Sequence, residues 1–319
     1  MASRRDFLGT ASLAAAGLAF APLAACSHES PPAPAAAPAR TRFAGPLLER
    51  TIPATGESIP VIGMGTSGSF EVGTDAASRA PLREVLKRFV EAGASVIDTA
   101  PTYSSAEDVL GDLVAEAKLR ERLFLATKLS GVDGRDQGLA QFEASLRRLR
   151  TDRIDLLQVH NLGDTRAQLA LARELKQQGR VRLVGLTHYR EPAQAQLAQE
   201  MRALKPDFVQ INYSPVSRAA ERTVFPLARE LGIAVMVNRA FEDGRLFSQV
   251  KGKPLPPWAA EVGADSWAQL FLKFALSEAA VTVVIPATSK PDNQTDNLKA
   301  GVGPLLDAKQ REALVAAIG

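Results

Sequence analysis

The sequence predicts an α/β fold: a closed (β/α)8 TIM barrel with an N-terminal β-hairpin at the barrel bottom. Short runs rich in β-branched residues alternate with amphipathic segments, which indicates a parallel sheet. Eight such repeats occupy roughly 250 residues, the usual size of this barrel. A Gly-x-Gly-x-x-Gly pattern, typical of open doubly wound sheets, does not follow the first run.

The elements are expected in a regular order. The predicted strands are residues 62–66, 95–98, 123–127, 154–159, 181–186, 208–211, 233–237 and 281–285. The predicted helices include residues 81–91, 139–150, 166–178, 191–204 and 219–231. Residues 48–61 contain the turn pair Thr55-Gly56 and predict the hairpin.

The longest stretch without a periodic pattern is residues 242–265. A loop of that length in a compact barrel is usually functional. Its Trp258 is expected either to wall a substrate pocket or to pack the loop onto the barrel.

The composition is that of a globular domain rather than a disordered chain or a nucleic-acid-binding protein. Of 319 residues, 46% are hydrophobic and 23% are charged, and the formal net charge is only +3. The chain has three histidines and one cysteine, so no metal site is predicted.

The N-terminus carries an export pattern. Arg4 and Arg5 precede an Ala-rich apolar stretch, so residues 1–26 are predicted to be a twin-arginine signal peptide. Cys26 follows Leu-Ala-Ala, which resembles the lipobox of lipoproteins; plain signal-peptide cleavage is the alternative. Residues 27–46 form a Pro/Ala-rich tether, and residues 47–319 form the barrel domain. We expect an exported, periplasmic or cell-envelope lipoprotein that is anchored in the membrane and uses the twin-arginine export machinery.

Polar side chains follow several predicted strands, where TIM barrels place their chemistry. They are Asp98 with nearby Tyr103, Lys128, His160, and the pair Thr187-His188. Alone, Asp98 could cap a helix, Tyr103 could pack a loop, Lys128 could be a surface charge and His160 a hydrogen-bonded core residue. Their occurrence in order at successive strand ends favours a site.

Residues 93–111, GASVIDTAPTYSSAEDVLG, resemble the aldo-keto reductase family. The resemblance covers about residues 48–300. It implies a TIM barrel that reduces a small carbonyl substrate with NADPH, with NADH also possible. It further implies that Asp98, Tyr103, Lys128 and His160 are the catalytic tetrad.

The chemistry of carbonyl reduction explains these residue types. Hydride transfer leaves charge on the carbonyl oxygen, so the site needs a proton donor. An ammonium about 4 Å from Tyr103, at an effective dielectric near 20, would stabilise its phenolate by about 4 kcal/mol, or roughly three pKa units. Asp98 is expected to keep Lys128 charged, and His160 to orient the carbonyl.

The resemblance also implies cofactor contacts. Thr187-His188 stands where the family usually has Ser-Asn, and Asn238 to Phe241 stand where it often has a stacking aromatic residue, for which Tyr213 or Phe241 could substitute. The expected set is Gly65, Thr66, Asp98, Thr187, His188, Gln210, Asn238, Arg239, Phe241, Thr288, Ser289, Lys290 and Asn297.

Two of these contacts decide how the phosphates are held. Arg239 is expected to bind the pyrophosphate or, alternatively, to form a structural ion pair. Lys290 is expected to neutralise a 2′-phosphate and so to favour NADPH.

Two other functions stay open at this point. One is a non-catalytic barrel that binds a nicotinamide cofactor as a redox sensor or accessory subunit. The other is a barrel that binds small ligands without hydride transfer.

Overall fold

A computed structural model describes residues 45–319 of the chain. The predicted signal peptide, its Cys26 and all but the end of the tether lie outside the described residues. Between residues 45 and 319 no helix has the length and apolar character needed to cross a bilayer.

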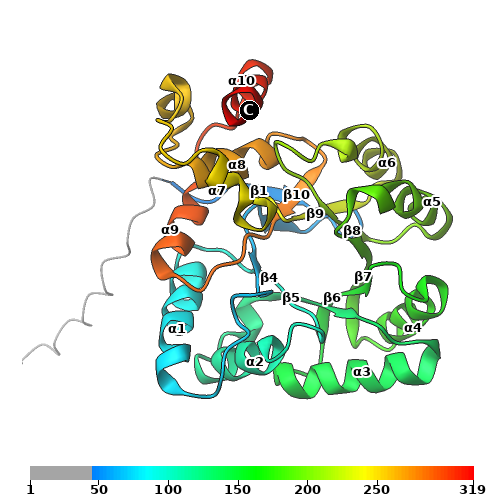
Figure 1. Cartoon of the computed structure of the whole chain (residues 1–319). Coiled ribbons are helices and arrows are strands. Elements are labelled where there is room, and N and C mark those ends of the chain that lie inside the picture. Colours follow the sequence, from blue (N-terminus) through cyan, green and yellow to red (C-terminus); the bar gives the residue numbers. More distant parts are fainter. Residues whose placement is uncertain (1–44) are drawn as a thin grey trace, which may run out of the picture. The chain divides into compact units, whose positions relative to one another are not determined.

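Eight parallel strands form the barrel, with helices around them (Figure 1), which confirms the predicted fold class. The sheet closes between its first and last strands: the backbone N–H of Gly63 donates to the carbonyl of Val284 at 2.8 Å, and that of Gly65 to Pro286 at 3.1 Å. The strands in barrel order are β3 (Met64–Gly65), β4 (Val96–Asp98), β5 (Phe124–Leu129), β6 (Ile154–His160), β7 (Val181–His188), β8 (Phe208–Asn212), β9 (Ala234–Asn238) and β10 (Val281–Val284).

The helices lie outside the strands. They are α1 (Ala76–Glu91), α2 (Ala106–Glu116), α3 (Gly134–Leu149), α4 (Thr165–Gln177), α5 (Gln194–Leu204), α6 (Val224–Leu231), α7 (Arg245–Gln249), α8 (Trp267–Leu276), α9 (Pro291–Lys299) and α10 (Ala308–Ile318).

Several predictions of element bounds are wrong; α3, for example, begins five residues before residue 139. Helix α1 begins five residues before Pro81, because the Asp75 carboxylate caps it by accepting from the N–H of Ser78 at 2.8 Å. Residues 242–265 are not irregular throughout, since they contain α7 and the 3₁₀ segment Pro257–Val262. Such short helices give too few turns for a recognisable hydrophobic period.

The hairpin of β1 (Glu49–Thr51) and β2 (Ser58–Pro60) closes the bottom of the barrel, as predicted. Its Ile52 and Ile59 are buried in one cluster with inward-facing residues near the starts of the strands, among them Leu156, Leu183 and Phe208. The barrel is thus filled with apolar side chains below and can only be hollow at the carboxyl ends of its strands.

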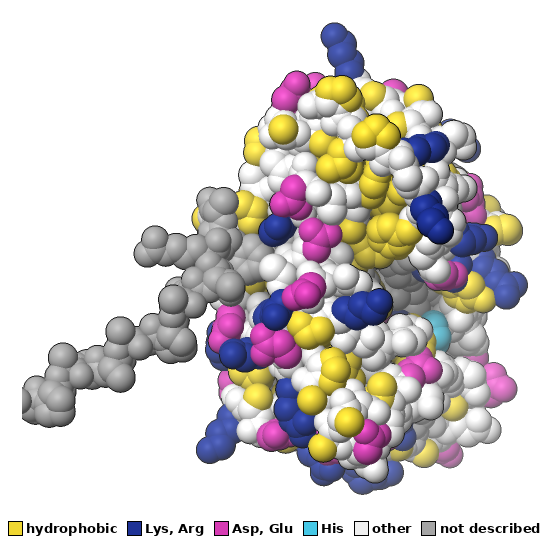
Figure 2. All heavy atoms as spheres, turned by 60° about the vertical axis from the view of Figure 1, so that its left-hand side comes forward, with side chains coloured by type: hydrophobic (Ala, Val, Ile, Leu, Met, Phe, Trp, Pro, Cys, Tyr) yellow, Lys and Arg dark blue, Asp and Glu magenta, His cyan; other side chains and the backbone are white. Residues whose placement is uncertain are grey.

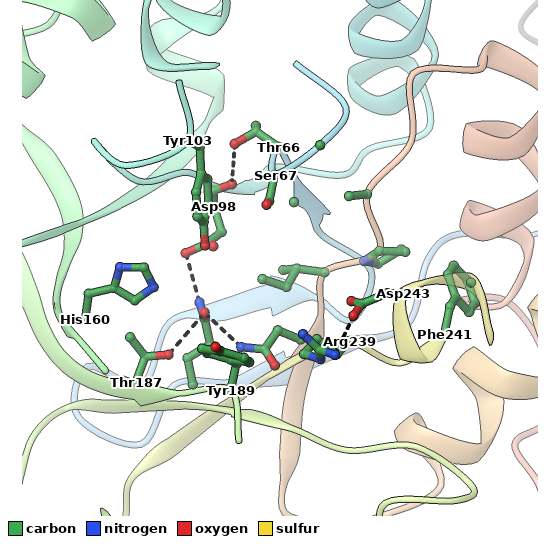
Figure 3. A pocket seen from close by; sticks show the side chains of 18 of the residues that line it. Thr66, Ser67, Asp98, Tyr103, His160, Thr187, Tyr189, Arg239, Phe241 and Asp243 are labelled. Atoms are coloured by element: carbon green, nitrogen blue, oxygen red, sulfur yellow. Dashed lines mark hydrogen bonds and ion pairs between the residues drawn. The ribbon is translucent and has the colours of Figure 1, made fainter. Parts of the chain in front are cut away.

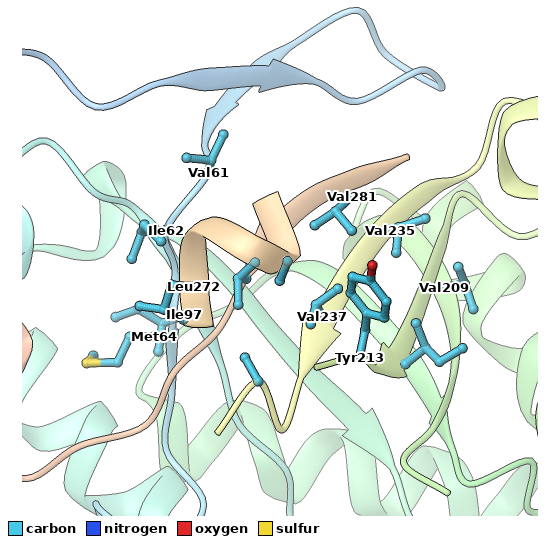
Figure 4. Packing of buried hydrophobic residues seen from close by; sticks show 14 of the residues in the cluster. Val61, Ile62, Met64, Ile97, Val209, Tyr213, Val235, Val237, Leu272 and Val281 are labelled. Carbon is cyan, nitrogen blue, oxygen red and sulfur yellow. The ribbon is translucent and has the colours of Figure 1, made fainter. Parts of the chain in front are cut away.

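A second hydrophobic layer lies between the strands and the surrounding helices (Figure 4). Side chains alternate along each strand, so residues such as Val235 and Val237 of β9 face this layer while Met236 faces the barrel interior. The same alternation decides which polar residues can reach the open end of the barrel.

Two residues of the segment 93–111 are required by the packing of the barrel. A Cβ at Gly111 would lie 2.0 Å from the carbonyl oxygen of Arg148, so only glycine allows α2 to approach α3 this closely. The buried carboxylate of Glu107 accepts from Thr127 Oγ1 at 2.6 Å and from Arg148 Nε at 2.7 Å. These contacts fix the loop that follows β4.

Candidate active site

The predicted catalytic residues meet at the carboxyl ends of the strands, in a cavity of about 700 Å³. Asp98, Tyr103 and His160 line the cavity (Figure 3). Lys128 is fully buried and does not line it. On one face of the molecule, hydrophobic side chains gather beside a hollow where a histidine is visible (Figure 2). The catalytic side chains meet because strand alternation turns Asp98 of β4, Lys128 of β5 and His160 of β6 inward.

Asp98 and Lys128 form a buried ion pair. The Lys128 ammonium donates to Asp98 Oδ2 at 2.7 Å and to the carbonyl of Thr99 at 2.7 Å. The other carboxylate oxygen, Oδ1, accepts from the side-chain amides of Gln158 and Gln210, each at 2.9 Å. Every oxygen of the buried carboxylate is therefore satisfied, as a buried charge requires.

The buried pair acts directly on Tyr103. The Lys128 ammonium lies 4.9 Å from the centroid of the Tyr103 ring. Burial, the largest single cause, lowers the pKa of Lys128, but the charge of Asp98 and the interactions with Tyr103, hydrogen bonds included, together outweigh it and raise that pKa above its usual value. Lys128 therefore stays charged at neutral pH.

The pKa of Tyr103 is shifted in the opposite direction to the one expected. Burial, the largest cause, raises it, and Lys128 opposes the rise through its charge and through hydrogen bonding. The net pKa lies above 10.0, whereas the sequence led us to expect a lowered one. The expectation included the ammonium but omitted the cost of removing the phenolate from water.

His160 ends β6, and its ring lies edge-on to that of Tyr103, 6.1 Å between centroids. Burial, with Lys128 and His188 contributing, lowers the pKa of His160 to about 3, so the imidazole is neutral at physiological pH. Its Nδ1 lies 2.6 Å from the hydroxyl of Ser130. The Ser130 backbone is held in turn by the side chain of Gln141, which bonds both its N–H and its carbonyl.

Sequence reasoning missed Ser130. It lies two residues after Lys128, immediately beyond the end of β5, and a serine in such a place carries no recognisable pattern. Only the pairing of β5 with β6 brings it to His160.

Most of the expected cofactor residues border the cavity, and some do not. Those in its lining are Gly65, Thr66, Asp98, Thr187, Gln210, Asn238, Arg239 and Phe241. Those outside the lining are His188, Thr288, Ser289, Lys290 and Asn297. The last four follow Ala287, at the cavity edge, and continue into α9.

His188 is displaced for a simple reason. Thr187 faces inward, so the next residue of β7 faces the other way. Tyr189 borders the cavity instead. The guanidinium carbons of Arg190 and Arg239 each lie 5.2 Å from the centroid of the Tyr189 ring.

Arg239 forms an ion pair with Asp243 at the cavity wall (Figure 3). The structural alternative considered for this residue is thus present, although Arg239 still faces the cavity. Tyr213 does not face the cavity as a stacking ring, because it is buried and its hydroxyl donates to Glu221 Oε1 at 2.5 Å. Trp258 packs against the hydrophobic layer rather than lining the cavity.

Two features suit a nicotinamide carboxamide. Asn238 Oδ1 is a buried acceptor without a hydrogen-bond partner among the described residues, while its Nδ2 donates to Gln210 Oε1 at 3.2 Å. The Thr187 hydroxyl lies 3.3 Å from the same Gln210 oxygen. Within residues 45–319, no cluster of three or more His, Cys, Asp or Glu side chains offers a metal site.

Comparison with known proteins agrees with this geometry. The chain is 29% identical over 238 residues to methylglyoxal reductase YeaE of Escherichia coli K12, covering 73% of this chain and 82% of that one. It is 28% identical over 267 residues to methylglyoxal reductase DkgB of Escherichia coli O157:H7, covering 81% and 93%.

Solved structures show the same fold. An aldo/keto reductase from Klebsiella pneumoniae, determined in complex with NADP and acetate, matches with a TM-score of 0.67 at 26% identity, covering 81% of this chain and 91% of that one. The holo form of an aldo-keto reductase from Bacillus halodurans matches with a TM-score of 0.68 at 24% identity, covering 85% and 96%. The sequence profile of the Aldo/keto reductase family matches residues 61–318, and the chain therefore belongs to that family.

Proposed function

We propose that this protein reduces an aldehyde or ketone to the alcohol with NADPH, and that Tyr103 donates the proton. The observation that carries the proposal is the buried Asp98–Lys128 pair, whose ammonium lies 4.9 Å from the Tyr103 ring at the floor of an open cavity. Family membership supports an NAD(P)H-dependent oxidoreductase.

The roles of the side chains follow from their contacts. Bound NADPH would supply a hydride to the carbonyl carbon, which leaves developing negative charge on the oxygen. Tyr103 delivers its proton to that oxygen, and Lys128 stabilises the phenolate that remains. Asp98 holds the ammonium in place through the 2.7 Å contact. His160, which is neutral, donates a hydrogen bond that orients the carbonyl.

Several residues would hold NADPH. Asn238 Oδ1 and the Thr187 hydroxyl would bind the nicotinamide carboxamide, and Arg239 would exchange Asp243 for the pyrophosphate. Lys290 is exposed next to the start of α9, where a 2′-phosphate would gain a cation and free helix N–H groups. The NADP-bound relative from Klebsiella pneumoniae supports this choice of cofactor.

The test is NADPH oxidation by residues 47–319 with a panel of aldehydes and quinones, comparing wild type with Tyr103→Phe. We expect multiple turnovers for wild type and a loss of about 10²-fold or more in kcat for the variant, the usual contribution of a general acid. NADPH affinity, measured by fluorescence, should change little. A single turnover without repetition under resupplied NADPH would favour the redox-sensor function instead.

We also propose that the enzyme is exported through the twin-arginine pathway and anchored by a lipid on Cys26. Support comes from Arg4 and Arg5, the apolar stretch and Leu-Ala-Ala-Cys. Fractionation of cells expressing the full chain tests this. Replacing both arginines by lysine should retain the protein in the cytoplasm, and Cys26→Ser should release it from the membrane; an unchanged distribution in either case would refute the corresponding step.

A further inference from the structure

A second hollow, of about 540 Å³, lies beside the active-site cavity. Its polar lining residues are Asn161, His188, Tyr189, Arg190 and Gln196. Asn161 and Tyr189 also line the cavity that contains Tyr103 and His160. We call this feature the side hollow; the two shared residues place it next to the active-site cavity.

The side hollow offers a positioned guanidinium. Arg190 Nε donates to the hydroxyl of Tyr189 at 2.9 Å, and its guanidinium carbon lies 5.2 Å from the Tyr189 ring centroid. These contacts leave the two terminal amino groups of Arg190 without a hydrogen-bond acceptor among the described residues. Within residues 45–319, Arg190 makes no ion pair. Arg239 differs, because its charge is already paired with that of Asp243.

The other polar groups of the side hollow can donate as well. The backbone N–H of Arg190 donates to His188 Nδ1 at 3.1 Å, so the neutral imidazole carries its proton on Nε2. The side-chain amides of Asn161 and Gln196 have no hydrogen-bond partner within residues 45–319. Asn161 has φ +52, a left-handed conformation that asparagine tolerates better than most residues and that places it at the junction of the two spaces.

The lining of the two spaces offers no unpaired carboxylate among residues 45–319. Among the described residues, no Asp or Glu lines the side hollow. The two acidic residues in the cavity lining, Asp98 and Asp243, are paired with Lys128 and Arg239. Unpaired N–H donors around an uncompensated guanidinium match a carboxylate, which accepts several hydrogen bonds and is favoured by positive charge.

We propose that the side hollow binds the carboxylate of a substrate whose carbonyl lies at Tyr103 and His160, so that the preferred substrates are carbonyl acids. The proposal rests on the reductase function proposed above. It adds Arg190 as the residue that determines the substrate class, with Asn161, His188 and Gln196 as further donors.

The experiment compares acids with their methyl esters, which have nearly the same shape without the charge. The pairs are 4-oxobutanoate and 4-carboxybenzaldehyde with their esters, so that a short and a longer carbonyl-to-carboxylate spacing are both sampled. Wild type should reduce at least one acid with a higher kcat/KM than its ester. Arg190→Gln should lower kcat/KM for that acid about tenfold, mainly through KM, because it removes a charged hydrogen-bonding partner, and should leave the ester unchanged.

Two further variants serve as controls. Arg190→Lys keeps the charge and should retain part of the preference for the acid. Arg147→Gln makes the same charge change at an exposed residue near the C-terminal end of α3, toward the opposite face of the barrel, and should alter neither substrate. Equal losses for acid and ester in Arg190→Gln, or an equal loss in Arg147→Gln, would overturn the proposal.

A binding measurement separates this proposal from the reductase function. Calorimetry with 4-(hydroxymethyl)benzoate, the alcohol of the aromatic acid, reports carboxylate binding without turnover. Weaker binding to Arg190→Gln than to wild type would support the side hollow even for an inactive preparation. Equal binding to both proteins would refute it, while reduction of the esters would still establish the reductase.

Discussion

The contribution of Lys128 to Tyr103 can be measured with Lys128→Met, which keeps the length of the side chain and removes its charge. With the 4.9 Å between the ammonium and the ring centroid taken as the charge separation, and at an effective dielectric near 20, the ammonium stabilises the phenolate by about 3.4 kcal/mol, or about 2.5 pKa units. Burial already raises the pKa of Tyr103. Without the ammonium nothing opposes that rise, and Tyr103 should become a much weaker acid.

The assay is single-turnover oxidation of bound NADPH on mixing with an aldehyde. We expect the rate to fall about a hundredfold, since general acid catalysis contributes about 10²–10⁴. NADPH affinity should stay near wild type. A rate within threefold of wild type would refute the electrostatic role of Lys128.

The variant also leaves the Asp98 carboxylate buried without its counter-charge, which ordinarily costs about 3–5 kcal/mol of stability. The amides of Gln158 and Gln210 still bond Asp98 Oδ1 and should reduce that cost. Urea unfolding of Lys128→Met and of the double variant with Asp98→Asn measures it. The double variant should be the more stable of the two and equally slow, which separates lost catalysis from lost folding.

Three other outcomes are expected. Ser130→Ala should lower kcat about fivefold, which corresponds to one hydrogen bond of about 1 kcal/mol, and should shift the imidazole ¹⁵N resonances of His160. Ser130→Thr should keep kcat and the resonances near wild type. Unchanged resonances in Ser130→Ala would exclude the contact. The pKa of His160 is lowered to about 3 in the folded protein, so below about pH 6.5 the unfolded chain binds more protons than the folded one. Stability should therefore fall as the pH falls, by at most about 2 kcal/mol between pH 7 and 5. Urea unfolding of His160→Gln should lack this loss, and a pH dependence identical to wild type would contradict the prediction. Lys290→Gln should weaken NADPH binding about tenfold and leave NADH binding unchanged, measured by fluorescence titration; equal losses for both would remove Lys290 from the 2′-phosphate site.

Much of this protein could be predicted from local patterns. Strands and helices alternate in the sequence because each strand–helix unit buries its apolar faces against its neighbours, and that periodicity identifies the barrel and its hairpin. Asp98, Lys128 and His160 were recognisable because they follow apolar runs directly, and strand ends lie at one end of a parallel barrel.

Other features depended on direction and distance, which no local pattern records. His188 follows an apolar run as Thr187 does, yet one step along β7 turns it out of the cavity and into the side hollow. The Tyr103 pKa depends on burial by residues distant in sequence, so a pairwise estimate with Lys128 alone gave the wrong sign.

The sequence by itself determined the fold and the residues that gather at the open end of the barrel, because hydrophobic periodicity and strand order are written along the chain. Only the tertiary structure decided that Ser130 contacts His160 and that Arg239 is paired with Asp243. It also decided that, among residues 45–319, Arg190 makes no ion pair and Asn238 has a buried acceptor without a partner. Such relations join side chains from different strands and loops. Their strength depends on separations of a few ångströms and on exclusion of water, and both are fixed only when the barrel closes.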